Sequence, residues 1–276
     1  MIKQKKIVLV TGGSSGIGKA VAEYLALNGF IVYGTSRSER KEEKASGVKM
    51  LKVDVTDEES ILSAISEIKT RHGALDVLIN NAGLGMAGPI ESTSAQEVEE
   101  IFNTNVFGVF NVCRAAIPLM RDSGGGNIIN ITSIAGHFGL PYRGIYCSSK
   151  FAVEGFSESL SMEIKKFGIE VSIIEPGDFK TSINQNRRLA QNVDEKTYPN
   201  FRSALNQVNR EVENAQDPIL IAHKIEKIVK TKKPSLYYQV GTPVQKLSIF
   251  LKRILPSRTF ERMIMKHYKM NTRRNP

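Results

Sequence analysis

The sequence of 276 residues lacks tryptophan altogether and holds only two cysteines, Cys113 and Cys147. Two cysteines cannot build a disulfide framework and do not show the paired spacing of a zinc site, so we expect a reducing, cytoplasmic environment and no catalytic thiol. Histidine is also scarce, and its four copies are too scattered to predict a metal site: His72, His137, His223 and His267.

Long hydrophobic runs are missing as well. No stretch approaches the roughly 18 consecutive apolar residues of a membrane-spanning helix, although 41% hydrophobic residues can supply a sizeable core. The apolar run after the basic start, residues 7–10, is too short for a signal peptide and leads into a glycine-rich turn. The sequence therefore predicts a single soluble domain that is at most attached to a membrane surface.

Acidic residues are in deficit, with 28 against 38 basic residues and a net charge of +10. The deficit is concentrated in residues 241–276, which hold nine basic residues and one acid, Glu261. The remaining chain is close to neutral and shows no helix-turn-helix, zinc-finger or aromatic RNA-binding motif. We therefore expect no nucleic-acid partner.

Short β-branched runs alternate with longer helix-periodic segments along residues 1–240. The runs that predict strands are residues 7–10, 30–35, 48–53, 75–79, 127–131, 169–174 and 236–240. The segments that predict helices are residues 17–27, 57–71, 95–120, 148–167 and 218–229. This alternation predicts an α/β fold of the Rossmann type: one domain with a doubly wound, seven-stranded parallel sheet covered on both faces.

One polar segment, residues 180–217, interrupts this alternation after the strand that ends near Pro176. Long insertions after the carboxyl end of a strand often cover a substrate site. We therefore expect a substrate lid here, with a disordered surface loop as the alternative.

A glycine-rich turn, TGGSSGIG at residues 11–18, lies between the first strand and the first helix. Glycines at this point let the backbone approach a pyrophosphate, and the helix N-terminus offers free N–H groups to the anion. The spacing differs from the G-x-G-x-x-G fingerprint, and a bare glycine-rich turn is the alternative. The residues expected to contact the phosphates are Gly12, Ser14, Ser15, Gly16, Ile17 and Gly18.

The end of the second strand carries Ser36 and Arg37 where an acidic residue would hold the ribose hydroxyls of NAD. A guanidinium favours the 2′-phosphate of NADP, and Arg40 and Lys41 add positive charge nearby, although all of them can equally form an ordinary solvated loop. We predict a preference for NADP(H) over NAD(H).

Tyr146 and Lys150 lie four residues apart, on one face of a predicted helix. Such a pair is common by chance, so its context decides its meaning. Ser133 lies at the carboxyl end of a predicted strand, where ligands bind in this fold. The three side chains together indicate a catalytic site.

With these motifs in place, the chain resembles the short-chain dehydrogenase/reductase superfamily, in its compact single-domain branch, over residues 5 to about 240. Seven motifs occur in the order typical of that family: residues 11–18, 54–55, 80–83, 103–108, 131–133 and 146–150, and Pro176-Gly177 followed by Thr181. The C-terminal extension resembles that of the steroid- and retinol-dehydrogenase-like subgroup.

The resemblance implies a catalytic role for four residues. Tyr146 exchanges a proton with the substrate oxygen, which asks a phenol of ordinary pKa ~10 to work near neutrality with help from positive charge. Lys150 supplies that charge and binds the nicotinamide ribose, Ser133 holds the reacting oxygen, and Asn105 completes a water-linked proton path. Each also has a structural alternative, such as a strand cap for Ser133 or a satisfied buried aromatic for Tyr146.

The resemblance also implies further cofactor contacts. Asp54 and Val55 flank the adenine, residues 81–83 (Asn81, Ala82, Gly83) form a turn on the ribose side, and Thr181 contacts the carboxamide after the Pro176-Gly177 turn. The family often assembles through the helices that follow Asn105 and Tyr146, so a homo-oligomer is expected.

The substrate side is less clearly encoded. Residues 136–144, with Asp178 and Phe179, are expected to form pocket walls. Their apolar members predict a hydrophobic substrate: Phe138, Leu140, Pro141, Tyr142 and Phe179. His137 is expected to be a plain loop histidine.

Residues 241–276 form a basic amphipathic extension, with apolar residues at helical spacing from Val244 to Ile254 and a second helical piece after Pro256. Such a tail can lie on anionic lipid through residues 244–270, close the substrate cleft, or pack against another subunit.

The sequence thus predicts an NADP(H)-dependent oxidoreductase that interconverts a carbonyl and an alcohol on a hydrophobic substrate such as a steroid, retinoid, keto-lipid or aromatic ketone. A 3-oxoacyl reductase of carrier-linked chains is one alternative. A dinucleotide-sensing protein without turnover is another, which the presence of all four catalytic residues argues against.

Overall fold

The computed structural model describes residues 5–39, 46–181 and 187–270. Several positions of interest lie outside the described residues: Arg40, Lys41, the part of the predicted lid from Ser182 to residue 186, and the terminal basic pair Arg273 and Arg274.

A seven-stranded sheet forms the centre of the molecule, in the order β3-β2-β1-β4-β6-β7-β9, with every neighbouring pair parallel. Its strands are β1 (Ile7–Val10), β2 (Ile31–Ser36), β3 (Lys49–Lys52), β4 (Val77–Asn80), β6 (Gly126–Ile131), β7 (Ile169–Pro176) and β9 (Tyr237–Val240). The strand order reverses between β1 and β4, the point at which ligands bind in such sheets. The predicted single-domain, doubly wound fold is confirmed.

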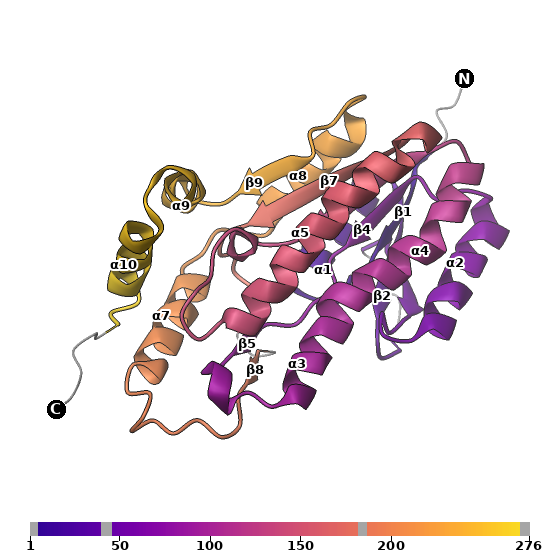
Figure 1. Ribbon diagram of the computed structural model, residues 1–276. Helices are drawn as coiled ribbons and strands as arrows, with labels where there is room; N and C mark the ends of the chain where they lie inside the picture. The colour runs from indigo at the N-terminus through magenta and orange to yellow at the C-terminus, as the bar shows by residue number, and fades with distance from the viewer. Residues whose placement is uncertain (1–4, 40–45, 182–186, 271–276) are drawn as a thin grey trace.

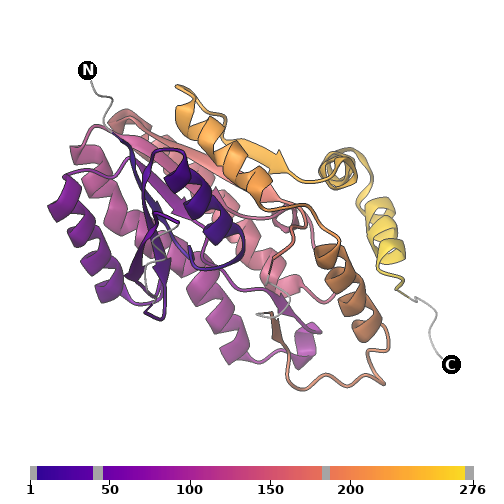
Figure 2. The same cartoon turned by 180° about the vertical axis from the view of Figure 1, so that it is seen from behind.

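Helices cover both faces of this sheet. One face carries α2 (Glu58–His72), α4 (Gly108–Asp122) and α5 (Gly144–Ile164), and the other carries α1 (Gly16–Leu27) and α8 (Ile219–Lys230) (Figures 1 and 2). Side chains alternate between the two cores along each strand: Leu9 packs under the first layer, whereas Val8 and Val10 pack under the second. A strand buried on both faces reads as a continuous apolar run, which is why β1 was recognisable in the sequence.

The predicted helix 95–120 is interrupted in the structure. It consists of α3 (Ala95–Phe102), a π-helical turn (Asn103–Phe107) and α4. The amide of Asn105 in this turn bonds both backbone groups of Leu84, at 2.7 and 2.9 Å. Widened helical turns of this kind occur often at functional sites.

Helix α5 begins at Gly144, four residues before the predicted start at Ser148. The Ser148 hydroxyl donates a hydrogen bond to the Gly144 carbonyl four residues earlier, so this serine lies one turn into the helix rather than capping it. The earlier start places Tyr146 inside the helix and close to its N-terminus.

Three helices gather beyond the carboxyl ends of β7 and β9: α7 (Phe201–Glu213), α9 (Pro243–Ile254) and α10 (Ser257–His267) (Figure 1). The segment before α7 also pairs β8 (Arg188–Leu189) with β5 (Met86–Ala87). Short 3-10 turns complete the described chain at Ile90–Ser92, Ile134–Gly136 and Lys165–Phe167. Within the three described ranges, no helix is both long and apolar enough to cross a bilayer.

Candidate active site

A cavity of about 560 Å³ opens at the carboxyl ends of the central strands, and sixteen of the eighteen predicted cofactor residues line it. They are Gly12, Ser14, Ser15, Gly16, Ile17, Ser36, Arg37, Asp54, Val55, Asn81, Ala82, Gly83, Tyr146, Lys150, Pro176 and Thr181. Gly18 instead packs against the start of the glycine-rich turn, where an added Cβ would lie 2.2 Å from the Gly12 carbonyl oxygen. Gly177 lines the neighbouring cavity described below.

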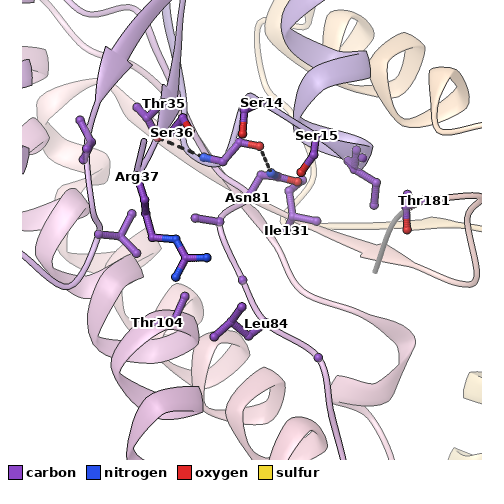
Figure 3. A pocket seen from close by; sticks show the side chains of 18 of the residues that line it. Ser14, Ser15, Thr35, Ser36, Arg37, Asn81, Leu84, Thr104, Ile131 and Thr181 are labelled. Carbon is purple, nitrogen blue, oxygen red and sulfur yellow. Dashed lines mark hydrogen bonds between the residues drawn. The ribbon is translucent and has the colours of Figure 1, made fainter. Parts of the chain in front are cut away.

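The glycine-rich turn borders this cavity. Gly12 has a left-handed φ of 65°, and its N–H donates to the Thr35 hydroxyl at 3.1 Å. The N-cap residue of α1, Ser15, makes no side-chain capping bond, which leaves the first-turn N–H groups open to an anion (Figure 3). These features fit a pyrophosphate group.

The other end of the cavity is cationic. Arg37 follows β2 and lies on the opposite side of the cavity from Thr181 (Figure 3). Of the described residues that follow β2, the one acid, Glu39, pairs with Lys52 at the surface, at 3.7 Å. The Asp54 carboxylate accepts hydrogen bonds from the backbone and hydroxyl of Thr56. This end of the cavity therefore offers the Arg37 guanidinium and the Asp54 carboxylate to a bound group.

Tyr146 lies near the start of α5, buried, and its hydroxyl is hydrogen-bonded to that of Ser133. Ser133 follows β6, and its hydroxyl also accepts the N–H of Ala135 at 3.1 Å. One turn along α5, the Lys150 ammonium donates to the carbonyl of Ile131 at 3.1 Å and lies 5.8 Å from the centre of the Tyr146 ring. The structure thus brings Ser133, Tyr146 and Lys150 together.

Asn105 closes this group from the π-helical turn. Its amide donates to the Ser149 hydroxyl at 3.0 Å in addition to its bonds with Leu84. A Cβ on Gly83 would lie 3.3 Å from the Asn105 amide oxygen and 3.8 Å from the Lys150 nitrogen, so both side chains border the same glycine. The hydrogen bonds of the Asn105 side chain therefore fix the backbone at Gly83 and Leu84, beside which the Lys150 ammonium lies.

Burial dominates the protonation of these groups. It raises the pKa of Tyr146, while the charge of Arg143 and the hydrogen bond from Ser133 act in the opposite direction. Burial also lowers the pKa of Lys150 to about 8. The Arg143 guanidinium lies 5.0 Å from the centre of the Tyr146 ring, closer than the Lys150 ammonium. Arg143 falls within the predicted pocket wall, residues 136–144, but its action on Tyr146 was not predicted; its place three residues before Tyr146 was the available signal.

A second cavity, of about 690 Å³, adjoins the first and shares Ile17, Gly85, Tyr146 and Thr181 with it. Ser133 also faces this second cavity. Its walls come from the loop after β6, from α7 and from the two C-terminal helices: Phe138, Leu140, Phe179, Val208, Val212, Leu247, Leu251, Phe260 and Ile264 are apolar members. The Tyr146 hydroxyl therefore lies where a dinucleotide and an apolar ligand would meet.

The predicted pocket walls are assembled in part. Phe138, Leu140, Asp178 and Phe179 line the second cavity. Tyr142 does not; its ring packs edge-on against Phe201 of α7, 5.3 Å between centres. Pro141 is likewise outside the lining.

Charged residues occupy part of this otherwise apolar second cavity: Arg143, Asp178, Arg187, Glu211 and His267. Several are already paired within the protein. Glu211 accepts from His267 at 2.8 Å, and Asp178 accepts from Gln245 at 2.7 Å. The contribution of α7 to this cavity was not predicted from the sequence. Residues 201–213 are mostly polar, and only one narrow stripe of that helix is apolar.

His137 is not a plain loop histidine. Its Nε2 lies 2.7 Å from Glu175 on β7, and its Nδ1 lies 3.8 Å from Glu154 on α5. Potential ligand atoms of these three residues fall within 4.8 Å of one another. Hydrogen bonding to Glu175 raises the pKa of His137, and burial raises the pKa of Glu154 to about 7. One oxygen of each carboxylate, Glu154 Oε1 and Glu175 Oε2, is buried without a hydrogen-bond partner among the described residues. The expectation of no metal stays a prediction.

Similar proteins were found by sequence and by structure. The family model for short chain dehydrogenase matches residues 6–192. A 3-ketodihydrosphingosine reductase from Bacteroides thetaiotaomicron is 44% identical over 92% of this chain and 94% of that protein. Retinol dehydrogenase 8 from Bos taurus is 32% identical over 93% of this chain and 88% of that protein. A solved short-chain dehydrogenase from Streptomyces avermitilis has a TM-score of 0.79 and 30% identity, covering 98% of this chain and 99% of that one.

Proposed function

Because the chain belongs to the short-chain dehydrogenase family, we propose that it is an NADP(H)-dependent reductase of a long-chain keto-lipid. One observation carries the proposal: the apolar second cavity, about 690 Å³ in volume, meets the dinucleotide cavity at Tyr146. Its size and apolar walls suit an extended alkyl chain whose ketone reaches Ser133 and Tyr146. The similarity to a 3-ketodihydrosphingosine reductase, whose name describes a ketone on a long-chain base, supports the same substrate class.

In the proposed reaction, a nicotinamide dinucleotide held by the lining of the first cavity would supply the hydride that reduces the carbonyl carbon. The Ser133 hydroxyl donates a hydrogen bond to the carbonyl oxygen and orients it toward Tyr146. The Tyr146 hydroxyl donates its proton to that oxygen as negative charge develops. Lys150 would hold the hydroxyls of the nicotinamide ribose, and Asn105 positions the turn beside Lys150. A proton from solvent then reaches Tyr146 by way of Lys150 and restores its hydroxyl.

We further propose that Arg37 and Ser36 select the phosphorylated dinucleotide. The support is the guanidinium in the cavity. The one acid among the described residues that follow β2, Glu39, is paired with Lys52 at the surface, so no unpaired carboxylate is available there for ribose hydroxyls.

A homo-oligomer is also proposed. Four large apolar side chains are exposed on the π-helical turn, α4 and α5, the helices that follow Asn105 and contain Tyr146: Phe107, Phe110, Phe151 and Met162. Exposed apolar residues gathered on adjacent helices support an isologous interface between two copies.

The proposed function is tested by following NADPH and NADH oxidation with a panel of 3-keto long-chain bases, 3-oxoacyl thioesters, keto-steroids, retinal and aromatic ketones. Tyr146→Phe removes the proton donor and is expected to abolish turnover, while Tyr198→Phe, a matched change outside both cavities, leaves it intact. Best activity on a 3-oxoacyl thioester would favour the carrier-linked alternative. NADPH binding without turnover of any ketone would contradict the enzymatic role.

A further inference from the structure

The outer surface of α9 carries a row of exposed apolar side chains. Val244, Leu247, Phe250 and Ile254 are 76%, 50%, 56% and 57% exposed, and their spacing of three, three and four residues places them on one side of the helix. The opposite side is packed: Ile249 is buried in a cluster with Phe138 and Phe260. The helix is therefore anchored to the protein by one face and presents a second apolar face to solvent.

This exposed row borders the mouth of the substrate cavity. Val244 and Leu247 belong both to the exposed row and to the cavity lining. Met263 of α10, which is 43% exposed, also lines the cavity. A continuous apolar surface thus runs from the outside of α9 into the cavity that ends at Tyr146. The two C-terminal helices project at one end of the molecule, well away from α4 (Figures 1 and 2).

Exposed positive charge is concentrated on the same two helices. The exposed basic residues of α9 and α10 are Lys246, Arg253, Arg258, Arg262 and Lys266. The one acid of the two helices, Glu261, is paired with Arg258 at 2.7 Å. An exposed apolar row bordered by cations is complementary to an anionic bilayer surface, in which acyl chains lie beneath negatively charged headgroups.

We propose that the apolar row of α9, with the cations of α9 and α10, docks the protein on an anionic lipid bilayer and opens the substrate cavity toward the acyl chains. A second copy of the chain fits this surface less well, because two such strongly basic surfaces repel each other. Docking itself does not depend on the identity of the substrate. The delivery of substrate from the bilayer does rest on the proposed keto-lipid activity.

The test uses the full chain and flotation with vesicles of phosphatidylcholine alone or mixed with phosphatidylglycerol. The variant is Phe250→Glu/Ile254→Glu, because these two residues belong to the exposed row but not to the cavity lining. A matched control, Leu27→Glu/Leu62→Glu, makes the same changes at exposed leucines of α1 and α2. Turnover of a short, water-soluble ketone with NADPH is measured for all three proteins.

We expect wild type and control to float with anionic vesicles and much less with phosphatidylcholine alone. The α9 variant is expected to bind anionic vesicles at least about tenfold more weakly, because two apolar anchors become charges, while its turnover of the soluble ketone is unchanged. Equal flotation of all three proteins, or none by wild type, would overturn the proposal. The proposal would also be overturned if light scattering showed a dimer for wild type and control but a monomer for the α9 variant, since the row would then join two copies of the chain. If none of the three proteins, wild type included, turned over the soluble ketone, that result would instead count against the proposed function.

Discussion

The group formed by His137, Glu154 and Glu175 makes the stability of this protein depend on pH in a direction that can be worked out. Burial raises the pKa of Glu154 to about 7, well above that of a carboxyl in the unfolded chain. Between these two values the folded protein binds a proton that the unfolded chain has already released, so the free energy of unfolding falls as pH rises. The raised pKa of His137 acts in the same direction, since its stabilising charge is lost as pH rises through the folded value.

The size of the effect follows from the shift at Glu154. A displacement of about 2.5 pKa units corresponds to about 3 kcal/mol at most, of which about 2 kcal/mol develops between pH 5.5 and 8.5. Glu154→Gln keeps the shape of the side chain but removes its titration. As pH rises from 5.5 to 8.5, the free energy of unfolding should therefore fall by about 2 kcal/mol less for the variant than for wild type.

The assay is urea unfolding followed by circular dichroism at pH 5.5, 7.0 and 8.5, suited to a chain without tryptophan. Glu163→Gln, at an exposed position of the same helix, serves as the matched control and should follow wild type. If the stability of Glu154→Gln declines with pH as steeply as that of wild type, the buried carboxyl is not the proton-binding group.

Two further predictions concern the active site. Arg37→Ala should raise the KM for NADPH by about 10- to 100-fold, as expected for the loss of a charge-assisted contact to a phosphate, while the KM for NADH changes little; equal effects on both cofactors in steady-state kinetics would place Arg37 outside the phosphate contact. Arg143→Met should raise the pKa of Tyr146, because the Arg143 charge lowers it, and so move the pH dependence of alcohol oxidation to higher pH. Arg143→Lys should preserve the profile in the same kcat/KM measurement, and an unshifted profile for Arg143→Met would show that this charge does not act on Tyr146.

Much of the fold was predictable because its signals are local. Each buried parallel strand is a short apolar run, so β1 and β4 were recognised within one or two residues of their observed bounds. The interruption at Asn103–Phe107 was not predictable in this way, because the π-helical turn is tied to a hydrogen bond with Leu84, about twenty residues away in sequence.

The residues of the candidate site likewise fall into those with a local sequence signal and those whose contacts form only on folding. Ser133, Tyr146 and Lys150 could be proposed from the sequence because Tyr146 and Lys150 are four residues apart, Ser133 follows a predicted strand, and all three stand in the motif order typical of the family. The contacts of Arg143 and His137 depend on elements that meet only in the folded chain: Arg143 faces Asp178 and Tyr268, and His137 lies between Glu154 and Glu175. Reading charge and periodicity along the chain cannot reveal such neighbours.

The C-terminal extension is not an exchangeable module, because Gln245 joins it to the catalytic end of the sheet. This side chain accepts the N–H of Thr242 at 3.1 Å, donates to Asp178 at 2.7 Å, and fills the space beside Gly177, where a Cβ would lie 2.1 Å from its amide oxygen. A chimaera that exchanged the extension between relatives would therefore transplant a wall of the second cavity as well as a surface. Divergence of this extension offers a route to new substrates that leaves the cofactor half of the protein unchanged.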